Sequence, residues 1–100
     1  MGFFSFNNDF EVIVNYPNDV TYKKFMSYIK NKGWKTIYAK ELEKISFQTK
    51  TRLISWPINF EIDFIANDNK STTLSVKASA THLDMGRSKG IVNDIINEIY

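Results

Sequence analysis

The sequence contains no cysteine and only one histidine. Without cysteine the chain has no disulfide scaffold, no zinc site built on thiolates and no cysteine nucleophile. A single histidine does not supply a histidine-rich metal centre. No apolar run approaches the ~18 residues that a transmembrane helix needs. These absences exclude several large classes of secreted protein, metalloprotein and membrane protein before any pattern is considered.

What remains has the composition of an ordinary folded domain. The chain has 100 residues, of which 43% are hydrophobic and 24% are charged, and this balance argues against disorder. A chain of this length buries about 65% of its surface on folding, which is enough for one core. We predict a single domain over residues 1–100, with residues 1–8 as a flexible N-terminal tail. The start of the chain lacks the pattern of a signal peptide, which predicts a cytoplasmic location, and abundant Ile, Asn and Lys suggest a bacterial source.

Five short segments alternate apolar and polar residues with the period of two that is typical of half-buried strands. The clearest is the fourth, where every second residue from Ile58 to Phe64 is apolar. The inward face of the second is ambiguous, because Trp34 and Tyr38 oppose Ile37. The predicted strands cover residues 10–16, 34–39, 44–51, 58–64 and 73–80.

Two other segments place apolar residues at helical spacing. The first helix is predicted from Asp19, a good N-cap residue, to about Asn31. Gly33 suits the left-handed position that ends such a helix. The second helix is predicted from Ser88 to Ile99, with its isoleucines and a valine on one stripe.

The predicted order of elements is therefore β-α-β-β-β-β-α. An antiparallel sheet with one polar face and two amphipathic helices makes a two-layer α+β domain. Both helices must lie on the apolar face of the curved five-stranded sheet, where they complete the core. This layout resembles the TATA-binding-protein-like fold and, more loosely, the helix-grip fold. That resemblance concerns shape and implies no function by itself.

The last third of the chain carries a second resemblance. The strand at residues 74–80, the Asp-Met-Gly-Arg-Ser turn at residues 84–88 and the following apolar helix resemble small bacterial families of unknown function. Those chains run from a strand through Asp-x-Gly-x-Asn to a final helix. Ser88 stands where the families usually have Asn, and the Gly-Trp step at residues 33–34 is also similar. The resemblance implies a non-catalytic accessory module.

The same turn has a structural explanation. Asp84 can accept backbone N–H groups in an Asx turn and place negative charge near the start of the last helix. Gly86 permits a positive φ, and Ser88 can cap the helix. Arg87 and Lys89 give a lesser alternative, a weak anion site at the helix N-terminus. The spacing departs from that of a P-loop, and Asp84 would repel an anion.

Residue types used in hydrolysis occur without the patterns that catalysis needs. His82, Asp84 and Ser79 match the types of a hydrolase triad, but they are local neighbours with no nucleophile elbow. His82 and Asp84 also fall short of the three or four ligands of a metal site. We predict that the protein is not an enzyme and has no metal and no cofactor.

One pair of carboxylates lies on the predicted polar face of the sheet. Glu61 and Asp63 share one face of the fourth strand, about 7 Å apart by the strand rise, and glycosidases use paired carboxylates. The pattern shows no cleft around them, however. Ion pairing with Lys77 or Lys50 on a neighbouring strand is the better interpretation.

The charges of the chain are unevenly distributed. Residues 22–52 contain nine basic and two acidic residues, although the net charge of the whole chain is only +2. A basic region can attract nucleic acid or an acidic partner. The predicted polar face is mixed in charge and has no aromatic platform on which bases would stack, so nucleic-acid binding is a lesser alternative. That face carries Glu11, Asn15, Ser46, Gln48, Lys50, Glu61, Asp63, Ser75 and Lys77.

A loop between the third and fourth strands is unusually apolar. Leu53, Ile54, Trp56 and Pro57 either cover one end of the core or form a contact patch. We predict a non-enzymatic protein-interaction or accessory module that docks through this loop and, in addition, through the Phe-rich N-terminus. The unpaired edge of the strand at residues 34–39 offers a further site, where a partner or a second copy can add a strand.

The alternative is a carrier of a small apolar ligand. A curved sheet gripped by two helices can enclose an apolar cavity. Ala78 and Ala80 are small residues beneath the last helix. The same small residues also permit close packing of that helix, so they do not decide between the two functions.

Overall fold

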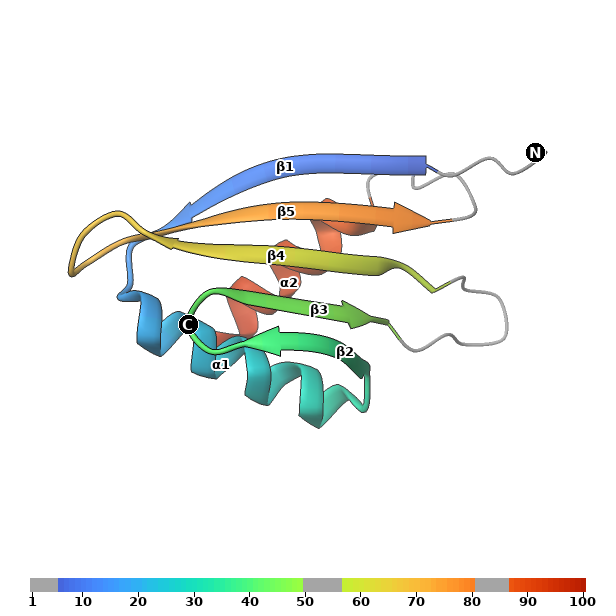
Figure 1. The fold of residues 1–100 in the computed structure, drawn as a ribbon, viewed down its shortest axis with the longest axis horizontal. Coiled ribbons are helices and arrows are strands. Elements are labelled where there is room, and N and C mark those ends of the chain that lie inside the picture. Colours follow the sequence, from blue (N-terminus) through green and yellow to red (C-terminus); the bar gives the residue numbers. More distant parts are fainter. Residues whose placement is uncertain (1–5, 50–56, 81–86) are drawn as a thin grey trace.

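The computed structural model describes residues 6–49, 57–80 and 87–100 (Figure 1). The five strands form one sheet in the order β1-β5-β4-β3-β2, and all neighbours run antiparallel. The predicted α+β class and the β-α-β4-α order are confirmed. The elements are β1 (Phe6–Val14), α1 (Asn18–Lys32), β2 (Lys35–Lys40), β3 (Lys44–Gln48), β4 (Asn59–Ala66), β5 (Thr72–Ala80) and α2 (Arg87–Ile99).

Both helices lie on one face of the sheet, as expected, and leave the other face uncovered (Figure 1). Helix α1 leads from β1 at one edge to β2 at the opposite edge, and it packs against α2 and β4. Phe25 and Ile29 of α1 are completely buried, as are Val92 and Ile95 of α2. These side chains meet the apolar face of the sheet and form a single core.

The alternation predicted for the central strands is confirmed. Phe60 and Ile62 of β4 and Leu74 and Val76 of β5 are buried, while the residues between them are not. Strand β1 differs from the prediction because it begins at Phe6 rather than at residue 10. Residues 6–8, expected to belong to a flexible tail, pair with β5 instead.

The start of helix α1 corrects another prediction. Asp19 is not the N-cap, because Pro17 holds that position in extended conformation and contributes no side-chain cap. The Thr21 hydroxyl donates a hydrogen bond to the Pro17 carbonyl at 3.0 Å, and Asp19 lies in the first turn, where its charge suits the helix dipole. At the other end Gly33 adopts the predicted left-handed conformation, with φ of 72°.

Contacts of the last residue hold the two helices together. The Tyr100 ring stacks on the Tyr16 ring with centroids 3.6 Å apart, and its hydroxyl hydrogen-bonds with that of Thr21. The Lys24 ammonium donates to the carbonyl of Ile99 at 2.8 Å, which satisfies one of the free carbonyls at the end of α2. Burial raises the pKa of Tyr100 above its ordinary value.

Candidate interaction surface

The uncovered face of the sheet, here called the open face, collects polar and charged side chains from all five strands. It is balanced in charge, with four acidic residues and four lysines. The cross-strand register places on it Asp9, Glu11 and Ile13 of β1; Thr73, Ser75, Lys77 and Ser79 of β5; Asn59, Glu61, Asp63 and Ile65 of β4; Lys44, Ser46 and Gln48 of β3; and Lys35, Tyr38 and Lys40 of β2.

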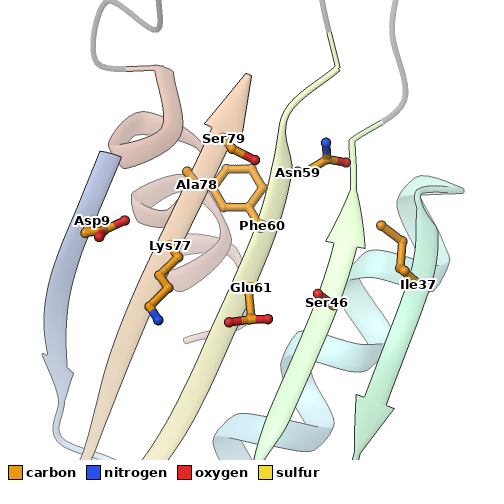
Figure 2. Close-up of a pocket in the computed structure, with 9 residues that line it drawn as sticks. All are labelled: Asp9, Ile37, Ser46, Asn59, Phe60, Glu61, Lys77, Ala78 and Ser79. Carbon is orange, nitrogen blue, oxygen red and sulfur yellow. The ribbon is translucent and has the colours of Figure 1, made fainter. Parts of the chain in front are cut away.

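Opposite charges alternate across the middle of the open face. Lys77 on β5 lies directly opposite Asp9 on β1 and Glu61 on β4. The Ser46 position on β3 is the next in the same row, and Figure 2 shows these side chains projecting from the same face. Such cross-strand rows of opposite charge stabilise an antiparallel sheet modestly.

The ion pairs of Glu61 and Asp63 are formed with Lys44, which the sequence analysis did not name, while Lys77, one of the two predicted partners, lies directly opposite Glu61. The Nζ atom of Lys44 lies 3.5 Å from Oδ1 of Asp63 and 3.7 Å from Oε2 of Glu61. Lys50 lies outside the described residues. The charge of Asp63, and then that of Glu61, raises the pKa of the Lys44 ammonium. One lysine ammonium therefore bridges both carboxylates.

Exposed apolar side chains also occupy the open face. The described residues include six large hydrophobic side chains that are exposed, and four of them belong here: Ile13, Ile37, Tyr38 and Ile65. Ile13 and Ile65 are both opposite Thr73, so they lie in one row. Ile65 and Tyr38 line the same hollow. We call Ile13, Ile65, Tyr38 and Ile37 the apolar band. It consists of two pairs, Ile13 with Ile65 and Tyr38 with Ile37, and the Lys44–Asp63 ion pair lies between them.

A bulge in β2 explains why the sequence left its inward face ambiguous. Lys35 pairs with Gln48 and Tyr38 pairs with Ser46, so three steps on β2 match two steps on β3. The extra residue is Ile37, which lines the open-face hollow drawn in Figure 2. A bulge of this kind places two successive side chains toward one face, and here both are apolar and more than half exposed.

Two shallow hollows mark the open face. One, of about 450 Å³, is bordered by β1, β5, β4, β3 and β2 and holds the charged row around Lys77 (Figure 2). The other, of about 540 Å³, lies between the Tyr38 and Ile65 side chains, with the Lys44–Asp63 ion pair among its lining residues. This mixture of carboxylates, ammonium groups and apolar side chains is more typical of a contact with another protein than of a binding site for one small apolar ligand.

The apolar loop predicted as a docking site is only partly described. Leu53, Ile54 and Trp56 lie outside the described residues. Pro57 is half-buried, and Ile58 after it is buried in the core. The backbone of Ile58 pairs with Thr49, which extends the contact between β3 and β4 toward the loop. The prediction that this loop contacts a partner therefore stays open.

The turn before α2 is also only partly described. Asp84 and Gly86 lie outside the described residues. Ser88 is the second residue of α2 and is completely buried. Arg87 begins the helix, and the Lys89 ammonium lies 5.7 Å from the centroid of the Phe10 ring. A lysine placed over an aromatic ring has a packing role, while the anion site proposed from Arg87 and Lys89 stays a prediction.

Among the described residues, the lysines of the basic middle of the chain lie on two sides of the domain. Lys23 and Lys24 of α1 line a hollow together with Glu98 of α2 on the helical side of the domain. Lys35 and Lys44, in contrast, belong to the open face. This division between two sides weakens the alternative of non-specific nucleic-acid binding, which needs lysines gathered along one surface.

The described residues contain no group of three or more His, Asp or Glu side chains arranged to hold a metal ion. No helix in the described part of the chain combines the length and the apolar character needed to cross a membrane.

No model of a known protein family matches the chain, and no curated protein matches it either. The resemblances drawn from the sequence alone therefore stay predictions.

Proposed function

We propose that the protein is a non-enzymatic interaction module that docks a protein partner on the open face of its sheet. The observation that carries this proposal is the apolar band, which holds four of the six large exposed hydrophobic side chains of the described residues. In an antiparallel sheet with one covered face, the residues that point toward the uncovered face are normally polar. Ile13, Ile37, Tyr38 and Ile65 depart from that pattern on the same face of the sheet.

The surroundings of the band suit a protein partner. Interfaces combine a few aromatic or aliphatic anchors with a polar rim. Tyr38 is 52% exposed, so its ring offers apolar area and its hydroxyl offers a hydrogen bond. The Lys44 pairs with Asp63 and Glu61 supply charged groups next to it. The loop around Trp56 stays a second candidate contact within the same proposal.

The carrier alternative has less support. The space between sheet and helices is filled by side chains that are completely or almost completely buried. Phe25 of α1 meets Phe64 edge to face with ring centroids 5.5 Å apart, and Phe47 stacks on Phe60 at 5.0 Å. Ala78 is buried in the same core. The described hollows lie on the open face and between the outer surfaces of the helices.

Site-specific photo-crosslinking tests the proposal. A benzophenone amino acid placed at position 38 should yield protein–protein adducts in extracts of the source cell. The same probe at position 23, on the outer surface of α1, should yield few. Ile65→Asp should suppress the adducts from position 38 and leave folding intact, because Ile65 is 48% exposed. Equal adducts from both positions, or adducts insensitive to Ile65→Asp, would contradict docking on the open face.

A further inference from the structure

Strand β2 forms an edge of the sheet, because it pairs with β3 on one side and is the last strand in the order (Figure 1). All six of its residues are exposed, including Ile37 at 56% and Tyr38 at 52%. An edge strand presents a row of backbone N–H and C=O groups that another extended strand can pair with. The end of the apolar band therefore coincides with a free strand edge.

The charges along this edge differ between its two ends. Lys30 and Lys32 stand in the last turn of α1, and Lys35 begins β2, so the first end carries three positive charges. The second end carries Lys40, Glu41 and Glu43, a net charge of −1. Lys40 and Glu43 already form an ion pair at 3.3 Å, which leaves Glu41 as the uncompensated charge there.

This edge is complementary to itself when one copy is reversed. In an antiparallel pair related by a two-fold axis, the first end of each β2 lies beside the second end of the other. With the axis near Tyr38, Lys35, three positions before it, lies opposite Glu41 of the other copy, three positions after it, and the relation occurs twice. A copy running in the same direction would instead place lysine beside lysine. Tyr38 lies near the middle of β2 and would fall near the axis, where cross-strand aromatic contacts add stability.

We propose that β2 is the contact of a symmetric dimer, in which two copies join their sheets by antiparallel pairing of this edge. The proposal rests on the proposed function and names a second copy of the chain as the partner. Edge lysines and a bulge are devices by which natural sheets discourage indiscriminate pairing. Here the edge lysines favour a strand that places carboxylates beside them. A reversed second copy of β2 does so, because its acidic end lies beside the lysine end. The bulge at Ile37 places an apolar side chain beside Tyr38 at the contact.

Charge reversal tests the geometry of the pair. Glu41→Lys places three lysines around each of the two contacts and should raise the dimer dissociation constant about tenfold, as expected for reversing two exposed ion pairs. Adding Lys35→Glu to it restores opposite charges and should restore the dimer. A mixture of the Lys35→Glu and Glu41→Lys proteins should form heterodimers more readily than either forms homodimers. Sedimentation velocity of the full chain over a wide range of concentration measures each constant.

The matched control is Lys23→Glu, which makes the same charge change as Lys35→Glu but on the outer surface of α1, and it should leave the dimer unchanged. Both contact residues, Lys35 and Glu41, are exposed, and urea unfolding of every variant checks that folding is preserved. Added salt should weaken the wild-type dimer, because it screens exposed charges.

Two results would overturn the proposal. One is a wild-type chain that stays monomeric at every concentration, and the other is a dimer whose dissociation constant does not change in Glu41→Lys. Neither result by itself contradicts docking on the open face. If position 38 still crosslinks to a different protein while the chain is monomeric, the proposed function stands and only the second copy is wrong. If the chain is monomeric and position 38 gives no adducts, both proposals fail.

Discussion

Truncation of Phe47 to alanine tests whether β3 has the register described. Phe47 is completely buried, and its ring lies between two others: Trp34 with centroids 5.9 Å apart and Phe60 with centroids 5.0 Å apart. Its neighbours Ser46 and Gln48 face the opposite, open side. The ring therefore ties the outer strands β2 and β3 to the core.

The expected loss follows from the burial. A phenylalanine ring removes about 150–250 Å² from water, which at about 25 cal/mol per Å² corresponds to roughly 4–6 kcal/mol. Measured phenylalanine-to-alanine changes in cores cost about 3–5 kcal/mol. A domain of this size is stable by about 5–15 kcal/mol in total. Phe47→Ala should therefore remove a large fraction of the free energy of unfolding, although it changes no residue of the open face.

Urea unfolding followed by circular dichroism measures the effect, and Tyr38→Ala is its matched control. Tyr38 is also an aromatic residue of the β2–β3 hairpin, but it is 52% exposed, so we expect a loss of no more than about 1 kcal/mol. A one-residue shift of register moves every side chain to the other face. A Phe47→Ala loss below about 1 kcal/mol, or an equal loss in Tyr38→Ala, would therefore refute the assigned register.

Three further predictions concern turns and charges. Gly33→Ala should destabilise the domain by about 1 kcal/mol in thermal unfolding, because φ is 72° while an added Cβ meets nothing within 4 Å; no loss would argue against the left-handed helix end. Two backbone N–H groups hydrogen-bond to Asp68 and lower its pKa, so this carboxylate stabilises the fold above its unfolded pKa and the contribution disappears as pH falls through the folded value. The free energy of unfolding of Asp68→Ala should therefore be lower than that of wild type at neutral pH and should approach it in strong acid. A difference that does not change with pH would contradict this reasoning. Lys44→Gln should leave Glu61 and Asp63 facing each other without a cation, so its Tm should fall below that of wild type at low ionic strength and recover toward it in high salt, which screens exposed charges; a fall that is the same at both salt concentrations would contradict the ion-pair role.

The central strands and the helices could be predicted because their signal is local. The alternation through β4 is consistent with only one orientation of the strand, in which Phe60 and Ile62 point inward. Gly33 is the residue type that most readily adopts the left-handed conformation at the end of α1. The start of that helix was predicted wrongly, because the preference of Asp for the N-cap position favoured Asp19. In the structure Pro17, in extended conformation, holds the N-cap position, and Asp19 lies in the first turn.

The features that could not be predicted depend on contacts between distant residues. Leu42 adopts a φ of 62° in the β2–β3 turn although it is neither glycine nor asparagine. Its carbonyl accepts a hydrogen bond from the Asn18 side chain at 2.8 Å, across 24 positions of sequence. The choice of Lys44 as the partner of Glu61 and Asp63 depends in the same way on the register between β3 and β4. No single segment contains either piece of information.

Prediction of the candidate interaction surface requires both the local alternation of residues and the pairing of distant strands. The sequence shows that Ile13 occupies a polar position of its strand, and Ile65 follows directly after the predicted end of another. Period-two alternation alone does not show that the two share a row, because the sequence does not indicate that β1 and β4 both pair with β5. Nor does it show that Ile37 is a bulge residue rather than an inward one. Once the strand order β1-β5-β4-β3-β2 is fixed, these exceptions lie on the same side, and that side is the one the helices leave uncovered. An isolated exposed isoleucine needs no explanation, but three isoleucines and a tyrosine on one uncovered face, ending at a free strand edge, are the arrangement expected of a surface that another chain covers.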